Sequence, residues 1–179
     1  AVAKSLNTVA WQVYEQVTPK VGLQYLKNMN FSSIVKDDYT LATSLGGFTK
    51  GVSPLEMASA YAALENDGMF RQPNCIKSIV DADENVVYSS QMAEVSIYEK
   101  DATRTMTDVL TTVMDSGTGA ALKLSNMPCA GKTGTTNDHK DGWFVGYTRY
   151  YTTSVWVGCD YPKSISNLSG STYPGQIWK

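Results

Sequence analysis

The sequence predicts an α+β fold in which helices pack against an antiparallel sheet. Apolar residues recur at helical spacing at the start of the chain, which is typical of an amphipathic helix. They are Val2, Leu6, Val9, Ala10, Val13 and Val17. Near the end of the chain, residues 143–147 and 152–158 have the apolar pattern of β-strands. Short connections join these last segments, which favours an antiparallel meander.

Local signals predict the helices that follow. Thr18-Pro19 is a favourable helix start, and the helix should run to about Met29. Residues 53–56 (Ser-Pro-Leu-Glu) combine a capping box with proline at the first helical position. The helix that they open should end at residues 66–68 (Asn-Asp-Gly). Its faces are mostly apolar or small, so we expect it to be largely buried.

The second half of the chain predicts a hairpin, a third helix and three strands. Residues 76–88 favour a short hairpin that turns at residues 81–85. The third helix ends at Gly117, and its apolar face carries Met106, Val109, Leu110, Val113 and Met114. One strand should pass through Lys132, one should run from Trp143 to about Arg149, and one from Thr152 to about Gly158.

We expect residues 1–179 to form one partial domain. Residues 1–69 should be the mainly helical half, residues 70–98 a short hairpin region and residues 99–122 a helix. Residues 127–160 should hold the core antiparallel strands. Residues 161–179 should be a C-terminal tail that leads into a helix beyond this sequence. The length suffices for a substantial core, and an apolar content of 42% disfavours disorder.

Composition excludes several function classes. The 15 basic and 17 acidic residues leave a net charge of −2 without a basic run, so we expect no nucleic-acid partner. No apolar run approaches the ~18 residues that span a bilayer. Cys75, Cys129 and Cys159 are widely spaced and His139 is the single histidine, so we expect no metal site and no cofactor. We expect no obligatory disulfide, and His139 should be a solvated turn residue.

Residues 130–136 (Ala-Gly-Lys-Thr-Gly-Thr-Thr) carry the strongest chemical signal. A lysine beside small and hydroxyl-bearing residues on an exposed strand suits an extended substrate that ends in a carboxylate. Gly131-Lys132-Thr133 also matches the end of a phosphate-binding loop. That motif needs a glycine five residues before Gly131, and Asn126 stands there, which disfavours it. An ordinary surface turn is the second alternative, because the tripeptide alone is a weak signal.

Other segments agree with the first interpretation. Ser5-Leu6-Asn7 is an S-x-N element, and S-x-N with K-T-G is typical of penicillin-binding proteins and class A β-lactamases. As a set, the motifs resemble the transpeptidase domain of class A (bifunctional) penicillin-binding proteins. The matching segments are residues 3–8, 44–47, 51–58, 60–62, 117–119, 130–136, 143–148 and 155–158. The resemblance implies the penicillin-binding, serine β-lactamase-like transpeptidase fold.

The resemblance also implies a nucleophilic serine in an S-x-x-K motif that precedes S-x-N. We expect that motif to lie outside this sequence, so that this chain is a C-terminal fragment of the domain and inactive alone. Ser33-Ile34-Val35-Lys36 is an S-x-x-K string, but it follows Ser5 and lies in a predicted loop. We interpret it as a coincidence.

Roles for site residues follow from the resemblance. Ser5 and Lys132 are the predicted catalytic residues: Ser5 relays a proton, and Lys132 is the cation of the site. Asn7 should orient the substrate's amide backbone. Thr133 and Thr135 should bind the substrate carboxylate through their hydroxyls, and the N–H of Thr135 should be half of the oxyanion hole. Gly134 should let the substrate backbone approach the strand, and Thr136 should extend the same wall.

Ser5 and Asn7 have an alternative, structural interpretation. Serine and asparagine both favour helix N-caps, so the pair could instead cap a helix that begins near Thr8. Residues two apart do not share a helix face. If the two side chains act together, they should therefore lie on a turn or at a helix end.

The implied function is D,D-transpeptidation, an acyl transfer through a serine acyl-enzyme that crosslinks peptidoglycan stem peptides and is blocked by β-lactams. A non-catalytic β-lactam-binding or sensory module and a β-lactamase-like hydrolase are the alternatives. The implied location is the bacterial cell envelope, at the outer face of the cytoplasmic membrane, with a membrane anchor upstream of this sequence. A companion polypeptide that carries the rest of the domain is an expected partner, because the sheet should have an unpaired edge.

Overall fold

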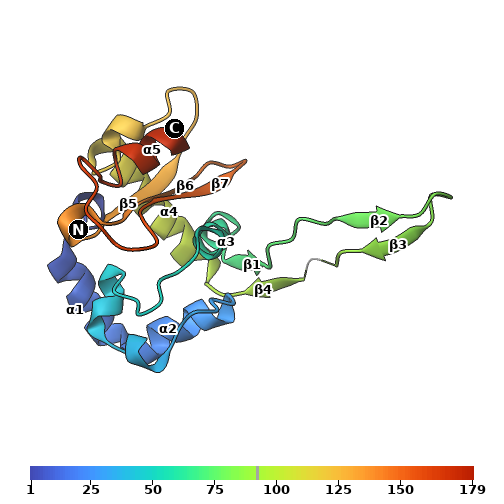
Figure 1. Cartoon of the computed structure of the whole chain (residues 1–179), viewed down its shortest axis with the longest axis horizontal. Coiled ribbons are helices and arrows are strands. Elements are labelled where there is room, and N and C mark those ends of the chain that lie inside the picture. Colours follow the sequence, from blue (N-terminus) through green and yellow to red (C-terminus); the bar gives the residue numbers. More distant parts are fainter. Residues whose placement is uncertain (92) are drawn as a thin grey trace.

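The computed structural model describes residues 1–91 and 93–179, and its centre is a three-stranded antiparallel sheet (Figure 1). The strands β5 (Ala130–Thr135), β6 (Gly142–Tyr147) and β7 (Thr152–Val157) follow one another in the order β5-β6-β7. Lys132 lies opposite Val145, and Val145 lies opposite Ser154. The predicted antiparallel meander is confirmed.

Helices cover both faces of this sheet (Figure 1). On one face, α3 (Pro54–Glu65) and α4 (Lys100–Ser116) lie against the strands, and Leu110 and Val113 of α4 form a buried cluster with Ala130 and Tyr147. On the other face, Trp178 of α5 (Tyr173–Trp178) joins a cluster of Met114, Leu122, Cys129 and Phe144. The sheet is therefore the middle layer of a helix–sheet–helix stack.

The N-terminal segment forms a short 3₁₀ helix, η1 (Val2–Lys4), and two α-helices, α1 (Asn7–Val17) and α2 (Pro19–Asn28). The predicted start of α2 at Pro19 is confirmed. The apolar stripe does not form one continuous helix, because Ser5 adopts a left-handed conformation between η1 and α1. Ser5 and Asn7 therefore lie at a turn and a helix start, as expected for two side chains that act together. No α1 residue is buried, and the exposed fraction is 39% for Trp11 and 54% for Val13.

Helix α3 begins with the predicted capping box. Ser53 Oγ accepts a hydrogen bond from the Glu56 N–H, and the Glu56 carboxylate accepts one from the Ser53 N–H. The expectation that the helix is largely buried is met only in part, because most of its residues are half-buried and Leu55 has an exposed fraction of 63%. Ser59 and Ala63 are its buried residues.

A buried carboxylate ties together the loop between α2 and α3. Asp38, at the end of the 3₁₀ helix η2 (Lys36–Asp38), accepts hydrogen bonds from the Thr49 N–H and hydroxyl, each at 2.7 Å, and from the Val35 N–H at 2.8 Å. These bonds, of which that from the Thr49 hydroxyl has the largest effect, lower the pKa of Asp38. The loop carries the short 3₁₀ helix η3 (Leu41–Leu45), which packs on α1.

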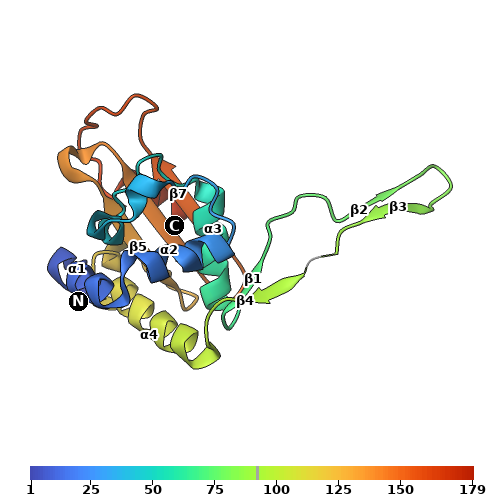
Figure 2. The same cartoon turned by 90° about the horizontal axis from the view of Figure 1, so that it is seen from below.

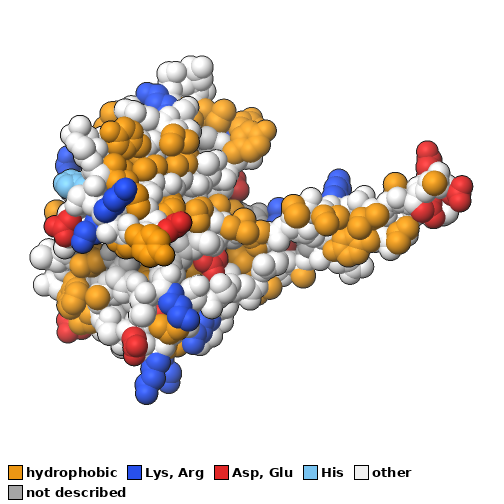
Figure 3. Space-filling model, in the orientation of Figure 1, with side chains coloured by type: hydrophobic (Ala, Val, Ile, Leu, Met, Phe, Trp, Pro, Cys, Tyr) orange, Lys and Arg blue, Asp and Glu red, His pale blue; other side chains and the backbone are white. Residues whose placement is uncertain are grey.

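Strands β1 (Met69–Arg71), β2 (Ser78–Val80), β3 (Val86–Ser89) and β4 (Glu94–Ser96) form an arm that projects from the rest (Figures 1 and 2). β2 pairs with β3, which confirms the predicted hairpin, and β1 pairs with β4. Apolar side chains lie along the arm and acidic ones at its far end (Figure 3). Of the helices in residues 1–91 and 93–179, none has the length and apolar character to cross a membrane.

Candidate active site

The structure brings Ser5 and Lys132 together at the outer edge of β5. The Lys132 Nζ donates a hydrogen bond to the Ser5 Oγ at 2.8 Å. It also donates to the carbonyl oxygen of Thr133 at 2.9 Å. An ammonium has three N–H donors, and these two contacts leave one donor for a ligand. The cation and the hydroxyl that the sequence predicts as catalytic are thus in direct contact.

Ser5 occupies an unfavourable backbone conformation. Its φ is 53° and its ψ is 49°, a left-handed geometry that costs a residue with a Cβ atom about 1–2 kcal/mol. The Ser5 N–H donates to the Val2 carbonyl oxygen at 3.0 Å, which closes the turn. Because this turn separates η1 from α1, the serine side chain projects from a bend. Strain of this kind gathers at functional sites.

Asn7 is the first residue of α1, two positions after Ser5. The residue at the N-cap is Leu6, and no side chain caps the helix. The alternative in which Ser5 and Asn7 serve as helix caps therefore does not hold. The Asn7 side chain is exposed, and its amide has both a donor and an acceptor to offer.

Burial changes the acidity of Lys132. Its side chain is half-buried between β5 and the N-terminal segment, and the resulting loss of solvation lowers the pKa of its ammonium. The lowered pKa means that the Lys132 ammonium gives up a proton more readily than the ammonium of an exposed lysine. This electrostatic setting is frequent in active sites.

Thr133 and Thr135 point to the face of the sheet opposite Lys132. Side chains alternate along a strand, and Thr133 lies opposite Phe144, whose ring packs on the α5 side. Each hydroxyl has a partner from another part of the chain. Thr133 Oγ1 lies 2.6 Å from Thr118 Oγ1. Thr135 Oγ1 accepts a hydrogen bond from the Gly170 N–H at 3.0 Å.

Gly134 lies between these threonines, and it closely adjoins Gly170. A Cβ atom on Gly170 would lie 2.7 Å from the Gly134 nitrogen and 2.4 Å from the Trp143 carbonyl oxygen. Cβ atoms essentially never make contacts below 3.0 Å, so any other residue at position 170 would force the backbone here to move. The C-terminal segment thereby reaches the backbone of β5 at the candidate site.

Thr136 begins the turn after β5. Its Oγ1 accepts hydrogen bonds from the Asp141 N–H at 2.7 Å and the Lys140 N–H at 3.1 Å. His139, in the same turn, has its Nδ1 2.6 Å from the Leu168 carbonyl oxygen. Because a carbonyl only accepts, Nδ1 carries the proton and donates. His139 is exposed in this turn, as predicted, and its ring also anchors the C-terminal segment.

The sequence did not assign a role to Thr118, which the structure places beside Thr133. The signal was present, since residues 117–119 belong to the matching segments.

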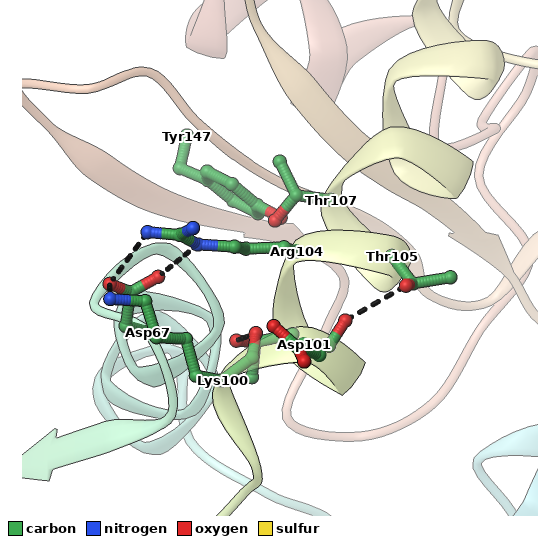
Figure 4. A network of polar contacts seen from close by, with 8 residues as sticks. Asp67, Lys100, Asp101, Arg104, Thr105, Thr107 and Tyr147 are labelled. Carbon is green, nitrogen blue, oxygen red and sulfur yellow. Dashed lines mark hydrogen bonds and ion pairs between the residues drawn. The ribbon is translucent and has the colours of Figure 1, made fainter.

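The far end of α4 is fixed to the end of α3, where Asp67 accepts from Arg104 Nε at 2.9 Å and pairs with Lys100 Nζ at 3.1 Å (Figure 4). Thr107 and Tyr147 also join α4 to β6 through their hydroxyls, 2.9 Å apart. These contacts join α4, which ends two residues before Thr118, to the end of α3 and to β6.

The S-x-x-K string at Ser33 lacks the geometry of a nucleophile motif. Ser33 lies in irregular backbone, and Lys36 is the first residue of η2, so one helical turn does not join them. Neighbouring Ser32 bonds to the Glu56 carboxylate through its N–H at 2.7 Å. Nothing in the described hydrogen bonds connects Ser33 with Ser5 or Lys132.

Other parts of the molecule offer no competing centre in the residues the structure covers. No group of three or more His, Cys, Asp or Glu side chains among them could hold a metal ion. The cysteines are free thiols: Cys75 is exposed, Cys129 buried and Cys159 half-buried. Two cavities of about 410 and 480 Å³, one at the base of the arm and one beside α3 and α4, are lined by neither Ser5 nor Lys132.

Comparison with known proteins identifies the family of this chain. Residues 1–172 match the family described as the penicillin-binding protein transpeptidase domain. The chain is 34% identical to penicillin-binding protein 4 of Bacillus subtilis over 179 residues, which is 100% of this chain and 29% of that protein. The chain spans less than a third of the length of that protein and of the penicillin-binding proteins 1A of Clostridium acetobutylicum and Aquifex aeolicus, which it also matches.

Solved structures have the same fold. Penicillin-binding protein 1A from Haemophilus influenzae superposes with a TM-score of 0.83 at 20% identity, over 98% of this chain and 32% of that one. PonA1 from Mycobacterium tuberculosis in complex with penicillin V gives a TM-score of 0.74 at 24% identity, over 86% of this chain and 46% of that one. The chain therefore belongs to the penicillin-binding protein transpeptidase domain family, as its motifs predict.

Proposed function

We propose that this chain forms part of a D,D-transpeptidase that crosslinks peptidoglycan stem peptides and is acylated by β-lactams. The observation that carries the proposal is the 2.8 Å contact between Lys132 Nζ and Ser5 Oγ at the free edge of β5. Acyl transfer needs a proton carrier beside the reacting serine and donors for the oxyanion and the substrate carboxylate. Ser5 and Lys132 can carry a proton, and the hydroxyl and N–H groups along β5 can donate to an oxyanion or a carboxylate.

Ser5 and Lys132 act in proton transfer. An activated serine attacks the carbonyl of the penultimate D-alanine, the amide bond breaks, and the terminal D-alanine leaves as an amine that takes a proton. Ser5 relays that proton, and Lys132 sets the charge beside it. Asn7 holds the amide backbone of the substrate. General acid–base assistance of this kind contributes about 10²–10⁴ in rate.

The β5 edge binds the substrate. The hydroxyls of Thr133 and Thr135 bind the terminal carboxylate of a stem peptide or β-lactam. Gly134 leaves room for the substrate backbone, and the Thr135 N–H is one donor of the oxyanion hole. Thr136 contributes through the turn that its hydroxyl stabilises. Loss of a single oxyanion donor costs about 10²–10³ in kcat.

The reacting serine comes from polypeptide outside the sequence described here, within the same domain. The relatives are three or more times longer than this chain, which is consistent with a reacting serine that lies outside the matched part. The complete protein works at the bacterial cell envelope, at the outer face of the cytoplasmic membrane, through an upstream anchor. PonA1, a protein of the same fold, binds penicillin V.

A companion polypeptide, which carries the rest of the domain, completes the fold. β7 pairs with β6 along one side, and no other described strand pairs with its other edge. Helix α1 presents Trp11 and Val13 to solvent, and unpaired strand edges and apolar faces favour association. In hydrogen–deuterium exchange, residues 152–157 should exchange more slowly in the full-length protein than in this chain alone. Equal rates would contradict a partner at β7.

Labelling with fluorescent penicillin tests the proposed function. The full-length protein should form a covalent adduct, and this chain alone should form none. Labelling of this chain alone would place the reacting serine among residues 1–179. A full-length protein that never labels would contradict the proposal. Release of the adduct within seconds would indicate a β-lactamase, and stable labelling without peptide crosslinking would indicate a sensory module.

A further inference from the structure

Thr118 connects the two sides of the candidate active site. Its backbone N–H donates to the carbonyl oxygen of Ala3 at 3.0 Å, just before the Ser5 turn. Its Oγ1 lies 2.6 Å from the Oγ1 of Thr133 on β5. One residue therefore contacts both the segment that carries Ser5 and the strand that carries Lys132.

The turn that holds Thr118 has little freedom. The N–H groups of Gly117 and Gly119 both donate to the Val113 carbonyl oxygen at 3.1 Å. A Cβ atom on Gly117 would lie 2.3 Å from the Ala3 carbonyl oxygen, so a glycine is required for the close approach of the two segments. Lys4 Nζ adds a bond to the Ser116 carbonyl oxygen at 3.0 Å. The backbone of Thr118 is thus held on both sides.

The hydroxyl pair has a fixed number of protons. Thr118 and Thr133 have one hydroxyl proton each, and the contact between them uses one. If Thr118 donates, the Thr133 proton stays available for an incoming acceptor. A hydroxyl that accepts a hydrogen bond also becomes a stronger donor. A carboxylate that accepts from Thr133 therefore favours the arrangement in which Thr118 donates.

Thr135 is arranged in the same way. Its Oγ1 accepts from the Gly170 N–H at 3.0 Å, which leaves its own proton free to donate. Thr133 and Thr135 share one face of β5. Each of these two hydroxyls therefore has a hydrogen-bond partner from elsewhere in the chain, and both can present a proton to the same anion when Thr118 donates to Thr133.

We propose that Thr118 is a positioning residue for carboxylate recognition, whose hydroxyl donates to Thr133 and directs the Thr133 proton toward the substrate carboxylate. This inference rests on the proposed function, and it adds a specificity determinant to that site. The ligand class is a peptide or β-lactam that bears a free carboxylate. An uncharged ester of the same ligand gains less from the oriented proton.

The test compares a fluorescent penicillin with its methyl ester on the full-length protein. Acylation rate constants are measured for the parent, Thr118→Val, Thr118→Ser and, as a matched control on α4, Thr112→Val. Thr112 is exposed, and its hydroxyl bonds only within its own helix, to the Val109 carbonyl oxygen. Valine keeps the shape of threonine and the Thr118 N–H bond to Ala3.

Thr118→Val should lower the ratio of acid to ester rate constants by about threefold to tenfold, the worth of one hydrogen bond. Thr118→Ser should restore the ratio, and Thr112→Val should leave it unchanged. Equal slowing of acid and ester in Thr118→Val would indicate a purely structural residue, and an unchanged ratio would also overturn the inference. Either result leaves the proposed function intact, whereas a parent protein that never reacts with the acid would refute both.

Discussion

The Nζ of Lys132 and the Oγ of Ser5 are 2.8 Å apart, although 127 positions separate the residues in the sequence. The contact joins the outer edge of the sheet to a strained turn in front of α1. Lys132 is desolvated there, which lowers its pKa, and it keeps an N–H donor for a ligand. Each of the two residues is held in place by a different part of the structure. Backbone hydrogen bonds within residues 1–5 hold Ser5, and the pairing of β5 with β6 holds Lys132.

Ser5 can be changed in two ways that separate stability from activity. Ser5→Ala and Ser5→Gly both remove the hydroxyl, and each should slow penicillin acylation of the full-length protein by about 10²–10⁴. Only glycine relieves the left-handed backbone, so Ser5→Gly should be more stable than Ser5→Ala by about 1 kcal/mol. Stopped-flow acylation and thermal unfolding measure the two effects. Acylation at the parent rate in both variants would remove Ser5 from the mechanism.

The free energy of unfolding should depend on pH through the buried carboxylate of Asp38. Asp38→Asn leaves the N–H groups of Val35 and Thr49 and the Thr49 hydroxyl without a charged acceptor at a buried position, and it should cost about 1–3 kcal/mol at pH 7. The control is Asp37→Asn, an exposed neighbour that should change stability little.

The pH dependence of that difference has a defined sign. The pKa of Asp38 is lowered below its ordinary value of 3.8, so its contribution is complete above that value and is lost as the pH falls through the folded pKa. The gap between parent and Asp38→Asn should therefore narrow below about pH 3.8, as followed by urea unfolding. A gap that stays constant into strong acid would contradict the lowered pKa.

Gly170→Ala should disturb the candidate site from the C-terminal side. The added Cβ would lie 2.4 Å from the Trp143 carbonyl oxygen, so the segment must move and Thr135 loses its N–H donor. We expect a loss of about 1–3 kcal/mol in stability, the usual cost of overpacking, together with slower penicillin acylation. Ser166→Ala, an exposed change in the same segment, is the control and should affect neither measurement.

The thiols should differ in reactivity. Cys75 is exposed on the segment that leads to β2, and Cys129 is buried next to β5. In a chromogenic thiol assay on the native protein, Cys75 should react first and Cys129 only after unfolding. Cys75→Ser should abolish the fast phase. A fast phase that persists in this variant would show that another thiol is open to solvent.

Many elements were predictable because their signals are local. Proline at the first turn and a capping serine mark α3, and a two-residue period marks β6, so these elements appeared where expected. The apolar stripe of residues 2–17 did not predict where the helix is interrupted or whether it is covered. Periodicity contains no information on the bend at Ser5 or on which segment packs against α1. The pairing of β1 with β4 was missed because each strand has only three residues.

The sequence by itself determined the family, the chemical identity of the candidate site residues and the strand that carries Lys132, because motifs and periodicity are properties of neighbouring residues. The tertiary structure alone decided that Lys132 contacts Ser5, that Thr118 contacts Thr133 and that Gly170 donates to Thr135. Each of these contacts depends on how α4, the sheet and the C-terminal segment pack. Packing of distant segments is set by the whole core, and no local pattern encodes it.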